Sequence, residues 1–206
     1  MPAIPSATVS RLVTYLRILA RLAEAEVTHT SSGALAKEAN VSAFQVRKDL
    51  TLFGSFGKRG TGYEVTTLLA TLRGILGLSR PWRVAIVGMG RLGQAIADYP
   101  NFDQYDFKLK AFFDTDRRKV GTVISGIEVE HPDELPRVVV QREIDIGFIT
   151  VPQHAAQLAA DTLVSAGVRG ILNFAPTVIS VPQEVHLEPV DFLAGLKRLA
   201  FYIQKP

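Results

Sequence analysis

The chain contains no cysteine among its 206 residues. This absence excludes disulfides, thiolate metal sites and thiol-based redox sensing, so any redox response would require a bound ligand. The sequence also has no run of about 18 consecutive apolar residues, which argues against a membrane span. Its first six residues lack the basic flank and apolar core of a secretion signal. We therefore expect a cytoplasmic protein.

Histidine is also scarce. The four histidines, His29, His131, His154 and His186, form no recognisable catalytic triad or metal-ligand spacing. We accordingly expect no catalytic residues and no metal site. His154, shortly after an apolar run that ends at Pro152, is the one candidate for a general acid.

Positive charge is concentrated in the first part of the chain. Residues 1–80 hold ten Lys and Arg against five Asp and Glu, whereas residues 81–206 hold thirteen against fifteen. A chain of this length accommodates two small domains. The basic first part indicates a polyanionic partner for that part alone, although a solvated basic face has the same composition.

Helical spacing dominates residues 6–52. One buried stripe is predicted for the first helix, from Val9, Leu12, Val13, Leu16, Leu19, Leu22 and Ala23. Ser31 or Ser32 is suited to cap a second helix that runs to about Ala39. Ser42 and Gln45 form a capping box that opens a third helix, Ala43 to about Leu52. The apolar members of this third helix are Phe44, Val46 and Leu50.

Two short helices joined by a tight turn predict a helix-turn-helix, in which the start of the second helix enters the major groove of DNA. The candidate DNA-binding residues there are Ser42, Ala43, Gln45, Arg47 and Lys48, of which the last four are expected to face outward. Their chemistry is suitable, because Gln pairs with adenine and Arg or Lys pairs with guanine or phosphate.

Residues 53–65 combine glycines at 57, 60 and 62 with two adjacent cations, Lys58 and Arg59. With Tyr63 and Val65 on a returning strand, this pattern predicts a β-hairpin wing whose tip reaches the minor groove or the phosphates. A helix over 67–76 then closes the unit near Gly77. Each piece alone also fits an ordinary helix or loop, and it is their order that favours a winged helix-turn-helix.

The second part begins with an apolar run, Trp82–Val87, typical of a buried parallel strand. It leads into a G-x-G-x-x-G motif and a predicted helix over 94–99, which is the context of a dinucleotide-binding turn. Gly88 permits the tight turn, Gly90 lets a pyrophosphate approach the backbone, and Gly93 allows close packing of helix on strand. The candidate cofactor-binding residues of this turn are Gly88, Met89, Gly90, Arg91, Leu92 and Gly93.

A second strand, over 109–113, ends at Asp114. An acid at this position accepts hydrogen bonds from the ribose hydroxyls and repels a 2′-phosphate, which favours NAD over NADP. Asp116 is an alternative for this role, and the adjacent Arg117 and Arg118 argue in the other direction.

Alternating patterns continue with strands over 144–151 and 170–174 and a helix over 155–166. They predict an α/β fold with a Rossmann-like, doubly wound parallel sheet, in which ligands lie at the carboxyl ends of the strands. The expected walls of the nicotinamide side are Thr150, Val151, Pro152, Asn173 and Phe174. We expect a DNA-binding domain at 1–80, a nucleotide-binding domain at 81–190 and a terminal segment at 191–206.

The terminal segment is a helix with a heavy apolar load, Asp191–Ile203. After the sheet is covered, such a face requires a partner surface. We expect a homodimer, whose two-fold symmetry suits paired helix-turn-helix units on palindromic DNA.

Five motifs in order resemble the Rex family of redox-sensing transcriptional repressors along essentially the whole chain. They are Ala43–Leu50, Arg59–Tyr63, Val87–Gly93, Asn173–Pro176 and Asp191–Gly195. The resemblance implies a homodimer with a winged helix, a Rossmann domain and a domain-swapped last helix. It also implies a repressor of genes for anaerobic, fermentative and respiratory metabolism, which NADH releases from DNA while NAD⁺ opposes the release.

The resemblance further implies roles for four residues. Phe192 of one subunit would shield the nicotinamide bound to the other, and Arg17, Tyr99 and Asp191 would link the DNA-binding domain, the Rossmann domain and the swapped helix. Two alternatives remain open at this point. One is an NAD-dependent dehydrogenase with an accessory domain, and the other is a CoA- or nucleotide-binding module whose first domain binds protein.

Overall fold

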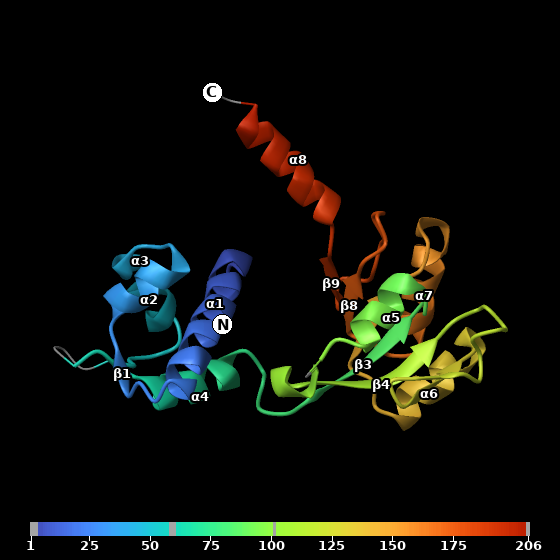
Figure 1. The fold of residues 1–206 in the computed structure, drawn as a ribbon, viewed down its shortest axis with the longest axis horizontal. Helices are drawn as coiled ribbons and strands as arrows, with labels where there is room; N and C mark the ends of the chain where they lie inside the picture. The colour runs from blue at the N-terminus through green and yellow to red at the C-terminus, as the bar shows by residue number, and fades with distance from the viewer. Residues whose placement is uncertain (1–3, 58–60, 101, 205–206) are drawn as a thin grey trace. The chain divides into compact units, whose positions relative to one another are not determined.

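The computed structural model describes residues 4–57, 61–100 and 102–204, and the chain divides into two units, Met1–Arg80 and Pro81–Pro206 (Figure 1). The described residues of the first unit form four helices: α1 (Ser6–Glu24), α2 (Ser32–Ala39), α3 (Ala43–Thr51) and α4 (Val65–Ile75). Two short antiparallel strands, β1 (His29–Thr30) and β2 (Tyr63–Glu64), complete it. We describe each unit by itself.

The buried face of α1 differs from the predicted stripe. Leu12 and Leu19 are buried as expected, but Val9 and Val13 are exposed. Tyr15 and Ile18 are buried in their place. A tyrosine is tolerated in a core when its hydroxyl has a partner, and here the hydroxyl donates to Asp49 on α3. The apolar pattern alone therefore predicted the helix and most of its buried face correctly, because Leu16, Leu22 and Ala23 also pack against the core, and it was wrong at Val9 and Val13.

The predicted wing hairpin is only partly correct. Tyr63 is on a strand, but that strand pairs with Thr30 just before α2, and no strand occurs in the described parts of 53–62. Val65 was expected on the same strand and instead begins α4. Lys58 and Arg59, the predicted wing cations, lie outside the described residues.

The second unit is built on a seven-stranded sheet with the order β5-β6-β4-β3-β7-β8-β9. Its strands are β3 (Trp82–Val87), β4 (Phe107–Phe113), β5 (Val123–Ile124), β6 (Ile127–Glu130), β7 (Ile146–Ile149), β8 (Gly170–Asn173) and β9 (His186–Pro189). Every neighbouring pair is parallel except β5 with β6. From β3 the chain adds strands first on one side and then on the other, which is the doubly wound arrangement.

Helices cover both faces of this sheet. Alternate residues of β3 point to opposite faces, so Ala85 and Val87 pack in one cluster with α6 (Leu135–Gln141) and α7 (Ala156–Ser165), while Val84 and Ile86 pack in another with α5 (Arg91–Ala97). Because both faces are buried from Val84 to Val87, this part of the strand is entirely apolar, and the charged Arg83 lies at its half-buried start. The helix after the glycine motif, α5, begins and ends earlier than the predicted 94–99.

Among the strands and α-helices of this unit, β5, β6, β9 and α6 are not predicted by the sequence patterns. The strands β5 and β9 are short and carry exposed or half-buried residues, so they lack the apolar signature of the central strands. The last helix, α8 (Phe192–Ile203), was predicted and buries none of its residues within this chain.

Candidate nucleotide-binding and DNA-binding sites

The strand register places five strand ends at one edge of the sheet. Val87 is level with Phe113 and Ile149, and these two are level with Glu130 and Asn173, respectively. The residues that directly follow these strand ends are Gly88, Asp114, Thr150, His131 and Phe174, and all five line one cavity of about 940 Å³. This is the edge at which open α/β sheets bind their ligands.

Steric contacts explain two of the motif glycines. Gly88 has a φ of 103°, and a Cβ there would lie 2.8 Å from Val151 Cγ1. A Cβ on Gly93 would lie only 2.1 Å from the carbonyl oxygen of Gly88. Both positions therefore require glycine for the fold of the turn.

Gly90 differs from these two, because a Cβ built on it would meet nothing within 4 Å. Gly90 lines the cavity, so its bare backbone faces space that is open to a ligand. In a dinucleotide-binding turn the pyrophosphate lies close to the backbone at this glycine. The residues present therefore fit a pyrophosphate beside Gly90.

Asp114 is buried at the end of β4, where its carboxylate is tied to the glycine turn. Its Oδ2 accepts from the backbone N–H of Met89 at 2.8 Å and from Lys119 Nζ at 2.7 Å, while Oδ1 accepts from the backbone N–H of Asp116. Lys119 also lines the cavity and was missed by the sequence analysis. The only sequence signal for it is a cation five residues after the acid.

The alternative acid, Asp116, is engaged elsewhere. Arg118 donates to both of its carboxylate oxygens, at 3.0 and 2.8 Å, and these hydrogen bonds lower the pKa of Asp116 to about 2. Arg118 is thereby paired with an acid, which weakens the sequence argument that it accommodates a 2′-phosphate. Asp114 and not Asp116 lines the cavity.

The far wall of the cavity is largely apolar. Of the predicted nicotinamide-side residues, Thr150, Val151, Pro152 and Phe174 line it. The Thr150 hydroxyl donates to the Gly88 carbonyl at 2.6 Å and thus joins β7 to the glycine turn.

Some predicted residues are not among those that line the cavity. Asn173 is buried, and its amide donates to the Thr177 carbonyl and accepts from the Ala175 N–H, so it shapes the loop that carries Phe174. Met89 points into the core, Arg91 is exposed, and Phe192 lies on α8. His131 and His154 also line the cavity. The sequence patterns indicated no role for His131 and suggested His154 only as a general acid.

The helix-turn-helix is present in the first unit. Ser31 caps α2 by accepting from the Ala34 N–H, and Ser42 caps α3 by accepting from the Gln45 N–H at 3.1 Å. Between them the chain turns at Asn40, whose φ of 52° is in the left-handed region that Asn tolerates. Both predicted caps are therefore confirmed.

The exposed face of α3 differs from the predicted one. Phe44, Arg47, Lys48 and Thr51 are exposed, and their spacing of three and four residues places them on one face. Phe44, one of the three apolar members of the predicted helix, is 67% exposed, because the other two, Val46 and Leu50, occupy the buried side. An exposed aromatic group in this place is suited to an apolar contact with a thymine methyl group.

Gln45 is partly buried and was expected to face outward. Its Nε2 donates to Asp49 Oδ1 at 2.8 Å. The same Asp49 accepts two hydrogen bonds from Arg11 at 2.6 and 2.7 Å and one from the Tyr15 hydroxyl at 2.9 Å. Asp49, only 1% exposed, therefore locks α3 onto α1. The predicted outward position of Gln45 is wrong because this buried carboxylate draws its amide inward.

The residues implied to couple the domains lie on separate elements. Arg17 on α1 is exposed, and Tyr99 after α5 is exposed with its ring edge-on to Phe102. Asp191 caps α8 by accepting from the Ala194 N–H at 2.9 Å. The exposed apolar residues of α8 are Phe192, Leu193, Leu196, Leu199, Phe201, Tyr202 and Ile203.

The described residues contain neither a membrane-spanning helix nor a cluster of metal ligands. None of their helices combines the length and apolar character needed to cross a bilayer. Within the same ranges, no three His, Asp or Glu side chains gather as ligands of a metal ion.

Two family models match the chain, one in each unit. The model described as "CoA binding domain" matches residues 79–177, and the one described as "Putative DNA-binding protein N-terminus" matches residues 3–51. The first covers the glycine turn and the strands that line the cavity. The second covers α1, α2 and α3.

Curated relatives match over nearly the full length. A redox-sensing transcriptional repressor Rex of Thermus thermophilus is 57% identical over 203 residues, which are 98% of this chain and 95% of the relative. A protein of the same name from Deinococcus radiodurans is 48% identical over 98% of this chain and 94% of its own length.

Solved structures agree with these matches. The Rex-family repressor RSP, in a crystal structure with β-NAD⁺ and operator DNA, is 37% identical with a TM-score of 0.94, over 100% of this chain and 94% of that chain. In a crystal structure with β-NADH it is 35% identical with a TM-score of 0.88, over 100% of this chain and 96% of that chain. With this identity over almost all of its length, the chain belongs to the Rex family of redox-sensing transcriptional repressors.

Proposed function

We propose that this protein represses transcription by binding palindromic operator DNA as a homodimer, and that NADH releases it from the DNA while NAD⁺ does not. The observation that carries the proposal is that one chain pairs a cationic recognition helix with a cavity at the strand ends, in a family whose solved members include complexes with NAD⁺, NADH and operator DNA. Membership of a family of repressors also decides against the dehydrogenase alternative.

In the first unit, we assign DNA contacts to the start and the exposed face of α3. They comprise Ser42, Ala43, Gln45, Arg47 and Lys48, together with Lys58 and Arg59 in the wing. Arg47 and Lys48 are exposed, whereas the contact of Gln45 with Asp49 uses one of its two amide N–H donors and leaves the other, with Oε1, for a base. A remaining donor and acceptor are suited to adenine, which presents an acceptor and an amino group in the major groove.

In the second unit, we assign the pyrophosphate to the glycine turn and the ribose to Asp114. The turn contributes Gly88, Met89, Gly90, Arg91, Leu92 and Gly93, and the nicotinamide side comprises Thr150, Val151, Pro152, Asn173 and Phe174. Phe192 of the partner subunit would close this side. The open space beside Gly90 and the mainly apolar wall at Val151, Pro152 and Phe174 support the assignment.

The segment 191–206 is assigned to dimerisation by exchange of α8 between subunits. None of the residues of α8 is buried within the chain, although much of its surface is apolar. Such a helix gains most of its stability from a partner surface. The domains are then 1–80, 81–190 and 191–206, and the protein acts in the cytoplasm, where it has access to both NADH and the chromosome.

The preference for NADH has a simple physical basis. The reduced nicotinamide ring is neutral and accepts an apolar neighbour such as Phe192, whereas the oxidised ring is cationic and loses hydration energy there. Only a difference in affinity between two arrangements of the dimer shifts their populations. The two cofactors therefore drive different outcomes although they occupy the same cavity.

The test is fluorescence anisotropy of a labelled palindromic promoter fragment at fixed salt, with the protein alone, with NADH and with NAD⁺. We expect binding that NADH abolishes and NAD⁺ does not. Binding that ignores both cofactors would contradict the proposal, and steady turnover of NADH with a carbonyl compound would restore the dehydrogenase alternative. A weak salt dependence would favour a protein partner for the first unit, because phosphate contacts make DNA affinity fall steeply with salt.

Asp191 tests the coupling between the sites. Asp191→Ala removes both the charge and the cap of α8, at a cost of about 1 kcal/mol in helix stability, whereas Asp191→Asn retains a capping oxygen without the charge. If the charge is what links α8 to the rest of the dimer, both variants bind DNA and NADH separately but lose release by NADH in the anisotropy assay. Unchanged release in both variants would remove Asp191 from the coupling.

A further inference from the structure

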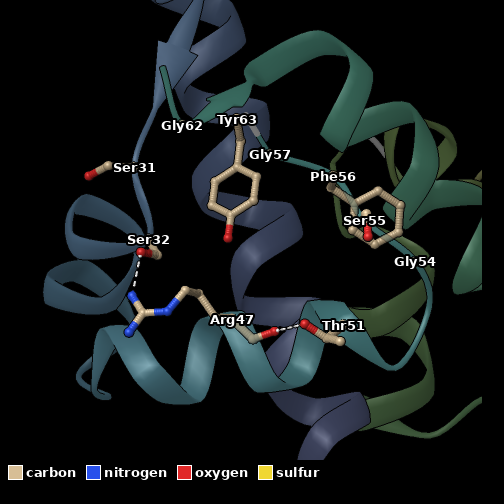
Figure 2. A pocket seen from close by; sticks show the side chains of 10 residues that line it. All are labelled: Ser31, Ser32, Arg47, Thr51, Gly54, Ser55, Phe56, Gly57, Gly62 and Tyr63. Carbon is tan, nitrogen blue, oxygen red and sulfur yellow. Dashed lines mark hydrogen bonds between the residues drawn. The ribbon is translucent and has the colours of Figure 1, made fainter. Parts of the chain in front are cut away.

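A second cavity, of about 510 Å³, lies in the first unit between the start of α2, the exposed side of α3 and the loop that leads to β2 (Figure 2). Its lining includes Ser31, Ser32, Arg47, Thr51 and Tyr63. The proposed function assigns a role to Arg47 but not to this cavity or to the tyrosine.

Tyr63 points its hydroxyl into this cavity (Figure 2). The residue is only 8% exposed. Within the ranges that the structure describes, the hydroxyl has no hydrogen-bond partner. The hydroxyl opens onto the cavity, so it is free to donate to a ligand that occupies this space. Burial also raises the pKa of Tyr63, which keeps the hydroxyl protonated and able to donate.

Two glycines of the loop hold the ring in this position. A Cβ on Gly57 would lie 2.9 Å from Tyr63 Cε1, so the loop backbone packs directly against the ring. Gly62 has a φ of 81°, and a Cβ there would lie 2.2 Å from the Thr30 carbonyl oxygen. The glycines of the wing motif thus seat the tyrosine at its place in the cavity.

Arg47 and two serines of the cavity are donors suited to an anion, whereas the Thr51 hydroxyl already donates to the Arg47 carbonyl. Arg47 Nη1 donates to Ser32 Oγ at 3.0 Å, which turns the guanidinium toward the start of α2 (Figure 2). The Ser31 and Ser32 oxygens accept hydrogen bonds, and their hydroxyl protons remain to be donated. No Asp or Glu is among the described residues that line the cavity. A phosphate group matches this set of donors.

The cavity is continuous with the exposed face of α3, because Arg47 and Thr51 belong to both. When a recognition helix lies in the major groove, the elements beside it meet the sugar–phosphate backbone. We propose that this cavity holds one backbone phosphate of the bound DNA, with Tyr63 and Arg47 as its donors. The inference rests on the proposed DNA-binding function and gives Arg47 a phosphate instead of a guanine.

The test uses the full-length protein with Tyr63→Phe, which keeps the ring and removes only the hydroxyl. Two fluorescent duplexes serve as probes: one selected by the wild-type protein from a random pool, and a scrambled duplex of the same composition. We expect about tenfold weaker binding to each, as for the removal of one hydrogen bond to a charged group, and an unchanged ratio between the two affinities. Tyr105→Phe, at an exposed tyrosine of the second unit, is the matched control and should bind as wild type does.

The outcomes separate the possible failures. Equal affinity of Tyr63→Phe and wild type, or a loss confined to the selected duplex, would overturn the inference, since a phosphate carries no sequence information. Failure of the wild-type protein to bind either duplex would overturn the proposed function itself. Thermal unfolding without DNA, titrated with inorganic phosphate, detects a site for a free anion. Stabilisation by phosphate that Tyr63→Phe abolishes, with DNA affinity unchanged, would reassign the cavity to that anion.

A second variant gives an independent reading. Arg47→Gln should lower the slope of log affinity against log salt by about 0.9 for each phosphate that the protein no longer neutralises, on both duplexes alike. A guanine contact would instead reduce the selectivity between the duplexes. That result would overturn the inference even if Tyr63→Phe folded poorly.

Discussion

Gly93→Ala is expected to destabilise the second unit by about 3 kcal/mol or more, which is the upper range for overpacking. The added Cβ would lie 2.1 Å from the Gly88 carbonyl oxygen, and the clash is with backbone, which cannot move aside as a flexible side chain would. The turn and α5 must separate to relieve it. Urea denaturation followed by circular dichroism measures the loss, and NADH binding by fluorescence should disappear with it.

Gly90→Ala is the matched variant for this prediction. Its Cβ would meet nothing within 4 Å of protein, so the free energy of unfolding should change by less than about 0.5 kcal/mol. The methyl group would nevertheless stand where we place the pyrophosphate. We expect a folded protein that binds DNA but no longer releases it with NADH. If Gly90→Ala binds NADH normally, the pyrophosphate does not lie beside Gly90, whatever the result at Gly93.

Asp49→Ala is the second large effect, with an expected loss of about 2–3 kcal/mol in the stability of the first unit, toward the low end for a broken buried ion pair. The change leaves the guanidinium of Arg11 and the buried hydroxyl of Tyr15 without their acceptor. Arg11 is 26% exposed at its side chain, so water compensates part of the loss. DNA affinity should also fall, because α3 loses its attachment to α1.

Denaturation of the wild type, Asp49→Ala and Glu24→Ala measures this effect. Glu24 is an exposed acid at the end of α1 and should change stability little. Equal stability of the Asp49 variant and the wild type would show that the network does not hold the two helices together.

The same carboxylate predicts a pH dependence. Burial by itself raises the pKa of Asp49, but hydrogen bonds from Arg11, together with those from two neighbouring side chains, outweigh it and lower the pKa below the ordinary 3.8. A group whose pKa is lower in the folded state stabilises the protein above the unfolded value and loses that effect as the pH falls. The stability gap between wild type and Asp49→Asn should thus be constant near neutral pH and shrink below about pH 4. A gap that persists in acid would contradict the role of the charge.

Local patterns were sufficient for much of the fold. The glycine motif between an apolar strand and a helix predicted the nucleotide-binding turn from six residues of sequence, although Val151, after a different strand, also limits the space at Gly88. Ser42 as the cap of α3 was likewise predicted correctly, because a cap contacts only its own helix. Family membership followed from motifs of the same local kind.

Long-range contacts were not predictable in this way. Whether Phe44 or Gln45 faces outward depends on Asp49, whose partner Arg11 is 38 residues away in the sequence. Both residues are chemically acceptable on either face of α3, so the spacing alone does not decide between them. The same holds for β2, which pairs with a strand before α2 instead of forming a hairpin.

By itself, then, the sequence determined the elements with a local signature: the capped helices, the glycine turn, the central strands and the apolar last helix. Only the tertiary structure decided which side chains those elements bring together, such as Asp114 with Met89 and Lys119, or Tyr63 with Arg47 at one cavity. The physical reason is that backbone periodicity is a short-range property, whereas the partner of a buried polar group is selected by packing between distant segments.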